Sequence, residues 1–496
     1  MRSIGLSKLA FLMSALLINS CFSINPNIVV QPETKRFIDS DGRERNFHGV
    51  NVVYKIPPFA PTLDFDVYQS FGPKDMQYLQ DWGLNIVRFG VMWAGVAPEA
   101  RGQYNETYLS YMRNMVDMME PYGIYALIDS HQDLYSLVYC GDGAPNWAAK
   151  PKAKEAFPIP VQLQPFVYDN TTGWPSDNEC GKHSWGSYYG TISVSSAFQS
   201  LYDNYDGIQD GFIEQWQQIA STFKTSTNTI GYELINEPWA GDIFVDPFLL
   251  YPGVADKKNL QPMYDRLNTG IRSIDSEHII FFESVTWDEL PKGVGFDHVP
   301  GGDEYRNLSA LSYHYYVPPD FSIDEIMDVR MKDLDKLGCA GMLTEFGGNV
   351  GDSESVLEST LLTMEAVERD NQGWIFWIYK DFAPDSYGHL FFNESGEPDW
   401  TRVKLFSRTY AQAVAGTTIN SQFDSTTAKF SLSYTINPAC KLPTEIYLNE
   451  ALYYPNGYSV EFIPQLYANY TSTTNRIFVN HIIDTSQELT VLITAN

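Results

Sequence analysis

Residues 229–238 read TIGYELINEP, a short apolar run that ends in Asn236 and Glu237 and is closed by a proline. Residues 341–348, GMLTEFGG, repeat this arrangement and place Glu345 at the end of the run. Short apolar runs bounded by glycine or proline are typical of strands buried on both faces of a parallel sheet. We therefore expect two buried strands, each of which ends in a glutamate.

Eight such runs alternate with amphipathic stretches between residues 46 and 415. The expected strands are 47–53, 84–89, 124–129, 229–235, 278–282, 308–313, 341–344 and 374–379. The expected helices are 73–82, 105–121, 208–223, 260–273, 323–337, 354–370 and 400–414. The alternation predicts an α/β fold, a (β/α)8 TIM barrel over residues 24–416 that is enlarged by loop insertions. A doubly wound sheet remains possible on the alternation alone.

Two regions depart from this pattern. The stretch from His131 to about Asp206 is a long loop rich in Gly, Pro, Trp and Tyr, and ordered loops of that length are usually functional. Beyond Gly416, short β-type runs between turn residues predict a small C-terminal all-β sandwich over residues 417–496. Its expected strands are 427–436, 445–448, 459–463, 475–483 and 489–493.

The N-terminus has the layout of a secretory signal peptide over residues 1–23. Arg2 and Lys8 precede the apolar run 9–18, which is too short to span a bilayer. A rival interpretation takes 18–21 (INSC) as a bacterial lipoprotein site, but Asn19 fits that motif poorly. No later run is long enough for a transmembrane helix, so we expect a secreted protein, extracellular or in a digestive cavity, with a lysosomal location as an alternative.

The composition describes an acidic globular protein. Hydrophobic residues make up 44% of the chain and aromatic residues 15%, which excludes a disordered chain. The 33 Lys and Arg residues face 61 Asp and Glu residues, for a formal net charge of −28. Such a surface repels phosphate backbones, so we expect no nucleic-acid partner. Nothing in the sequence demands more than a monomer.

Cysteines and sequons agree with secretion. Once Cys21 is removed with the signal peptide, an even set remains in an oxidising compartment, where disulfides are expected: Cys140, Cys180, Cys339 and Cys440. Cys140 and Cys180 share one loop, so we favour that bridge, with Cys339–Cys440 as a second pair. A zinc site is the alternative, but the chain has no C-x-x-C and no clustered His. Glycosylation sequons occur at Asn105, Asn170, Asn307, Asn393 and Asn469.

Polar residues follow the expected strands at the points where the strands end. In a barrel these ends form the active-site face. The residues found there are Arg88, His131, Asp133, Asn236, Glu237, His314, Tyr316, Glu345 and Trp377. We therefore expect them to line one cleft.

Two carboxyl groups in such a cleft are what glycoside hydrolysis requires. One is held protonated for the leaving oxygen and the other stays ionised to attack the anomeric carbon. Arg88 and Tyr316 are expected to keep Glu345 ionised, and Asn236 to bind the sugar 2-hydroxyl. His131, Asp133 and His314 are expected to meet sugar hydroxyls, and Trp377 to offer a flat face to the ring. No metal or organic cofactor is implied.

Several motifs resemble those of glycoside hydrolase family 5. They are 236–238 (NEP), 88–90 (RFG), 130–133 (SHQD), 314–316 (HYY), 344–347 (TEFG) and Trp377. Within that family the chain is most similar to the endoglycoceramidases, through 129–133 (DSHQD), the cysteine-bearing insertion, 341–348 and the β-sandwich tail. The resemblance implies retaining hydrolysis of the glycan–ceramide bond in glycosphingolipids, with Glu237 as acid/base and Glu345 as nucleophile. It also implies that Lys55 contacts sugars beyond the first glucose.

Two other functions stay open on the residues alone. A secreted endo-β-glucanase or β-glucosidase would use the same two glutamates, and a catalytically silent glycan- or lipid-binding protein would not need them. A ceramide substrate, presented at a membrane or micelle surface, requires an apolar trough beside the carboxylates. The expected trough residues lie in 243–251 and 390–392.

Overall fold

The centre of the molecule is a closed barrel of eight parallel strands. The computed structural model describes residues 27–286, 290–316, 321–347, 353–382, 390–393 and 395–496. The barrel order is β10-β11-β4-β5-β6-β7-β8-β9. Its strands are β4 (His48–Val52), β5 (Ile86–Gly90), β6 (Tyr125–Asp129), β7 (Thr229–Glu233), β8 (Ile279–Glu283), β9 (Ser309–Tyr315), β10 (Ala340–Phe346) and β11 (Gly373–Phe376). The predicted TIM barrel is confirmed, and the doubly wound alternative is excluded.

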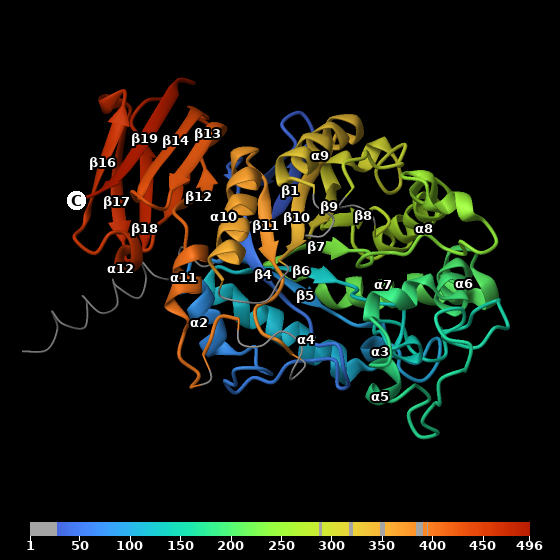
Figure 1. The fold of residues 1–496 in the computed structure, drawn as a ribbon. Coiled ribbons are helices and arrows are strands. Elements are labelled where there is room, and N and C mark those ends of the chain that lie inside the picture. Colours follow the sequence, from blue (N-terminus) through green and yellow to red (C-terminus); the bar gives the residue numbers. More distant parts are fainter. Residues whose placement is uncertain (1–26, 287–289, 317–320, 348–352, 383–389, 394) are drawn as a thin grey trace, which may run out of the picture.

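Helices surround the barrel, as Figure 1 shows. The main ones are α2 (Pro73–Asp81), α4 (Glu106–Met119), α7 (Ile208–Phe223), α8 (Gln261–Arg272), α9 (Ile323–Leu337), α10 (Glu354–Arg369) and α11 (Trp400–Phe406). Their bounds follow local signals: α9 begins with a Ser322–Glu325 capping box and ends at Gly338, whose φ is +66°. None of the helices in the described part of the chain has the length and hydropathy needed to cross a bilayer.

The long loop after β6 is ordered by short helices and one disulfide. It contains α5 (Asp177–Cys180) and α6 (Ile192–Tyr202), and it extends from the barrel at the lower right of Figure 1. Cys140 and Cys180 form the expected bridge across a sequence separation of 40. The insertion is therefore a fixed part of the barrel mouth rather than a plain connector.

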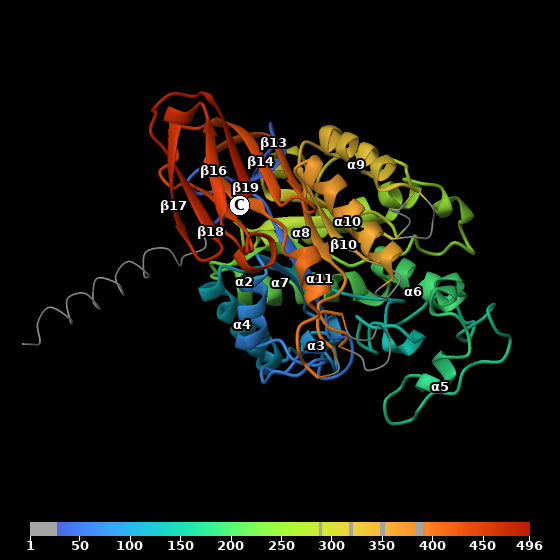
Figure 2. The same ribbon diagram turned by 60° about the vertical axis from the view of Figure 1, so that its left-hand side comes forward.

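Two antiparallel sheets form the C-terminal sandwich, which stands beside the barrel in both ribbon views (Figures 1 and 2). The seven-stranded sheet runs β1 (Ile28–Gln31), β2 (Arg36–Asp39), β3 (Glu44–Arg45), β12 (Tyr410–Val414), β15 (Thr444–Tyr447), β18 (Arg476–His481) and β17 (Ala468–Thr473). The four-stranded sheet runs β13 (Gly416–Asp424), β14 (Lys429–Ile436), β19 (Glu488–Ala495) and β16 (Tyr458–Ile463). Both sheets contribute to one apolar core, as the sandwich prediction requires.

The seven-stranded sheet takes strands from both sides of the division placed at residue 416. β12 precedes that residue, and β1–β3 come from the beginning of the described chain. The helix expected over 400–414 is wrong beyond Phe406, because β12 is a central strand buried between β3 and β15. Ile28, Val30 and Phe37 also pack against residues from the N-terminal ends of the barrel strands, so these early strands close the barrel floor.

The second expected disulfide is wrong. In the described part of the chain Cys339 and Cys440 are free thiols. Cys339 is fully buried beside β10 in the barrel, whereas Cys440 lies in the sandwich, in the turn between β14 and β15. Cys21 and the predicted signal peptide lie outside the described residues. All five sequon asparagines are exposed, and their glycosylation stays a prediction.

Candidate active site

Two glutamates meet at the C-terminal end of the barrel. Glu237 follows β7 and Glu345 lies near the end of β10, and a carboxylate oxygen of each lies within 4.8 Å of the other and of His314. The Glu237 side chain is 16% exposed and the Glu345 side chain 7%. Retaining glycosidases hold their carboxyl groups about 5–5.5 Å apart, whereas inverting ones need about 6.5–9.5 Å to admit a water. The close pair fits the retaining geometry.

Arg88 is fully buried at the centre of the barrel and ties these strand ends together. Its Nη1 donates to Glu345 Oε2 at 3.0 Å and its Nη2 to Asn236 Oδ1 at 2.8 Å. It also pairs with Glu233 and, at 3.2 Å, with Asp129. Three carboxylates around one guanidinium raise the pKa of Arg88 despite its burial, so it stays charged. Arg88 therefore connects four strands through one fixed fork of donors.

Opposing influences act on Glu345. Burial raises its pKa, and the nearby charge of Glu237 acts in the same direction, while His314 and Arg88 lower it. Tyr316 donates its hydroxyl hydrogen to Glu345 Oε1 at 2.5 Å, a short charge-assisted bond that favours the ionised form. The expected contacts of Arg88 and Tyr316 with Glu345 are confirmed, although burial still leaves the pKa of Glu345 above its ordinary value.

His314 contacts the first glutamate, Glu237, and its expected contact with a sugar hydroxyl stays a prediction. Its Nδ1 lies 2.9 Å from Glu237 Oε1 and 3.3 Å from Glu283 Oε1. Burial lowers the pKa of His314, but the carboxylates of Glu283, Glu345 and Glu237 outweigh it and raise this pKa well above its ordinary value. An imidazolium at this point donates its Nδ1 hydrogen to Glu237 and forms an ion pair with Glu283.

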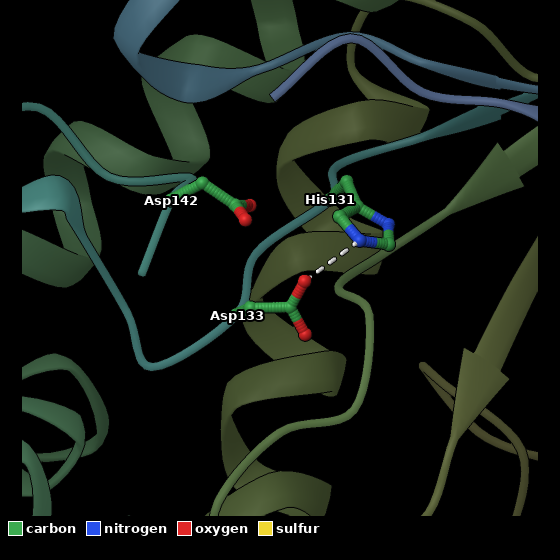
Figure 3. Close-up of side chains that lie close together, drawn as sticks. All are labelled: His131, Asp133 and Asp142. Carbon is green, nitrogen blue, oxygen red and sulfur yellow. Dashed lines mark hydrogen bonds and ion pairs between the residues drawn. The ribbon is translucent and has the colours of Figure 1, made fainter. Parts of the chain in front are cut away.

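A second charged cluster lies on the first part of the long insertion, where Figure 3 shows His131, Asp133 and Asp142. His131 Nδ1 contacts Asp129 Oδ2 at 2.8 Å and its Nε2 contacts Asp133 Oδ2 at 3.3 Å. Lys55 pairs with Asp133, and its Nζ is 3.9 Å from Asp142 Oδ2. The cluster of Lys55, His131, Asp133 and Asp142 therefore contains its own cation, because the Lys55 ammonium contacts both carboxylates of the insertion.

Trp377 forms one wall of this cluster. Its ring stacks on His131 with centroids 5.3 Å apart and an interplanar angle of 13°, and Lys55 Nζ lies 4.6 Å from its centroid. Burial and the Lys55 ammonium lower the pKa of His131, but Asp129 and the hydrogen bonds to Asp129 and Asp133 outweigh them and raise this pKa to about 9. Burial raises the pKa of Asp142 to about 7. Asp142 Oδ1 is buried and has no hydrogen-bond partner among the residues that the structure describes. An acceptor of this kind is suited to a ligand hydroxyl.

The structure brings every site residue expected from the sequence to this end of the barrel. It adds four that were missed: Asn51, Asp142, Glu233 and Glu283. Glu283 carried a usable signal, because it ends the run IIFFE as Glu237 ends its own run. Asp142 carried none, since it lies within a loop without periodicity.

An exposed apolar loop follows the β7 strand end. Val245 is 81% exposed and Phe248 66%, with Phe244, Leu250 and Tyr251 also exposed. The loop is held in place by buried Leu249, by Asp242 and Asp246 accepting from loop backbone N–H groups, and by the ion pair of Asp246 with Lys258. The other expected trough segment, 390–392, is instead buried core: Phe391 packs on Trp82 and Phe406.

The fold and the carboxyl pair together define a barrel glycosidase of the retaining class. The sequence profile of cellulase (glycosyl hydrolase family 5) matches residues 39–383, and that of the glycoside hydrolase family 5 C-terminal domain matches residues 408–493. The chain therefore belongs to glycoside hydrolase family 5. Its relatives at 43% identity place it among the endoglycoceramidases of that family.

Endoglycoceramidase of Cyanea nozakii is 43% identical over 460 residues, covering 92% of this chain and 90% of that protein. Endoglycoceramidase of Hydra vulgaris is also 43% identical, over 91% of this chain and 86% of that protein. The solved endo-glycoceramidase II from Rhodococcus sp. in complex with ganglioside GM3 has a TM-score of 0.75 at 21% identity, covering 92% of this chain and 99% of that one. The resemblance noted from the motifs is confirmed, and the solved structure supports it at the level of fold.

Proposed function

We propose that this chain hydrolyses the β-glycosidic bond between the oligosaccharide and the ceramide of glycosphingolipids, releasing an intact glycan and ceramide. The observation that carries the proposal is the Glu237–Glu345 pair, whose carboxylate oxygens lie within 4.8 Å at the strand ends. The two endoglycoceramidase relatives at 43% identity support the substrate class.

The mechanism is a double displacement. Glu345 attacks the anomeric carbon of the ceramide-linked glucose while Glu237 protonates the ceramide oxygen, and Glu237 then activates water to release the glycan. Arg88 and Tyr316 hold both oxygens of Glu345, which aims the nucleophile. Asn236 accepts from Arg88 and donates one Nδ2 hydrogen to the Gln132 carbonyl, leaving the second for the sugar 2-hydroxyl.

The cluster of Lys55, His131, Asp133 and Trp377 binds sugars. It lies beside the glutamate pair and offers charged donors and acceptors along an aromatic wall. Because these groups contact one another, sugar hydroxyls bind by exchanging with contacts within the cluster.

The ceramide reaches the site from a membrane or micelle surface. The exposed apolar loop after β7 supports this, because a glucan substrate gives no reason to expose Val245 and Phe248 next to the acid/base strand. The N-terminal signal-like segment, the Cys140–Cys180 disulfide and the exposed sequons support secretion into an oxidising compartment.

Mass spectrometry of the products tests the function. Purified protein is incubated with lactosylceramide or a ganglioside, and with a β-glucan in parallel. Intact oligosaccharide plus free ceramide is the expected result. Shortened glucan with untouched glycolipid would overturn the glycolipid assignment while leaving the two-glutamate mechanism in place.

A further inference from the structure

Glu283 lies behind the glutamate pair, at the end of β8, and its side chain is 1% exposed. Its Oε2 accepts the backbone N–H of Glu237 at 2.7 Å. Its Oε1 lies 3.3 Å from His314 Nδ1, the same atom that is 2.9 Å from Glu237 Oε1. One buried carboxyl group thus contacts Glu237 twice, through its backbone directly and through its side chain by way of His314.

The backbone at Glu237 needs such a support. Its φ is +36°, in the left-handed region that residues with a side chain rarely adopt. The carbonyls of Asn236 and Glu237 accept from Gln132 Nε2 at 2.7 and 2.9 Å, so both sides of this peptide turn are fixed. Strain of this kind persists only where surrounding contacts over-determine it.

Glu283 is surrounded by groups from four elements. Tyr264 on α8 donates to its backbone carbonyl at 2.7 Å. The charged groups that face its carboxyl are His314 on β9, Glu233 on β7, Glu237 after β7, and Arg88 on β5. Burial raises the pKa of Glu283 well above its ordinary value, and Glu237 and Glu233 act in the same direction against His314 and Arg88. An apolar side chain would fill this buried position equally well. Barrel packing alone therefore does not explain why a carboxyl group is present here.

We propose that Glu283 is the positioning residue of the acid/base: it orients Glu237 through the backbone N–H and, by ion pairing, holds the His314 imidazolium that contacts Glu237 Oε1. The inference rests on the proposed roles of the two glutamates. Because Glu283 acts through Glu237, its removal impairs protonation of the leaving group and leaves nucleophilic attack by Glu345 intact.

The dependence on the leaving group tests this. Glu283→Gln keeps an oxygen for the Glu237 N–H but removes the carboxylate. The values of kcat/KM, which report the first displacement, are compared for phenyl and 2,4-dinitrophenyl lactosides. Phenol departs slowly without protonation, whereas dinitrophenolate departs without it. We expect kcat/KM to fall about ten- to hundredfold for the phenyl substrate and less than about threefold for the dinitrophenyl one.

Asp256→Asn is the matched control, because Asp256 is a buried carboxylate that accepts the backbone N–H of Val285 at 2.9 Å, close in sequence to Glu283. In this variant the kcat/KM values for the two lactosides are expected to change by equal factors. Glu283→Asp, which keeps the charge but loses reach, is expected to show the same split as Glu283→Gln and serves if the latter does not fold. Equal losses with both lactosides, or no loss with either, would overturn the proposal.

Lactosylceramide is assayed with the same samples. If the wild type cleaves the aryl lactosides but not lactosylceramide, the proposed substrate fails while the Glu283 comparison still stands. If the wild type cleaves all three and Glu283→Gln shows no leaving-group split, only the positioning role is refuted.

Discussion

Tyr316→Phe is expected to move the acidic limb of the pH profile upward. The Tyr316 hydroxyl donates to Glu345 Oε1 at 2.5 Å, and the acceptor side chain is 7% exposed. A hydrogen bond to a charged group contributes about 1.5–3 kcal/mol, and each pKa unit corresponds to about 1.36 kcal/mol. Loss of a donor that favours the carboxylate raises the pKa of Glu345, so the expected shift is about one to two pH units.

The environment of Glu345 also decides the direction of the pH shift and the pKa from which it starts. In the proposed mechanism Glu345 attacks only when ionised, so activity appears as pH rises through its pKa, which burial already raises above the ordinary value. The assay is kcat/KM for phenyl lactoside against pH, for the wild type and for Tyr316→Phe. Tyr315→Phe is the matched control, because the Tyr315 hydroxyl donates to the Phe321 carbonyl at 2.9 Å instead. An acidic limb that is unchanged in Tyr316→Phe would refute the reasoning.

Three further outcomes are expected. Glu345→Gln should lower turnover by more than about a thousandfold while circular dichroism shows an intact fold; near-wild-type hydrolysis would remove it from the mechanism. Replacing Cys140 and Cys180 by Ser should destabilise the insertion by up to about 4 kcal/mol, for a sequence separation of 40, and speed its proteolysis; unchanged proteolysis would contradict this. Phe248→Ser with Tyr251→Ser should lower binding to phosphatidylcholine vesicles about tenfold or more while soluble aryl lactosides react as before; equal losses in both assays would argue against a lipid contact.

Much of the barrel was predictable because its strands are buried on both faces. Such strands are short, continuous apolar runs, and all eight were expected near their observed bounds. The sandwich was less accessible. β17 is exposed apart from its first residue and β13 is largely exposed, so neither shows a clear apolar alternation. β12 was mistaken for the end of a helix, because a buried strand and a buried helix segment share the same composition.

The pairing of distant segments was beyond reach for a different reason. β3 pairs with β12 across most of the chain, and Cys339 and Cys440 remain apart although their number suggested a bridge. No local sequence pattern predicts either fact, because strand partners and the distance between two thiols depend on how the two domains pack.

The glutamate pair illustrates where the boundary falls. Sequence sufficed to identify Glu237 and Glu345, because the ends of parallel strands share one face of a barrel and apolar runs mark those ends. Glu283 ends a run in the same way, yet it faces the Glu237 backbone and His314 rather than the cleft. Only the packing of β7, β8 and β9 decides which strand-end carboxyl lies beside Glu345 and which lies against the backbone of its neighbour, since that depends on distances of a few ångströms between residues far apart in the chain.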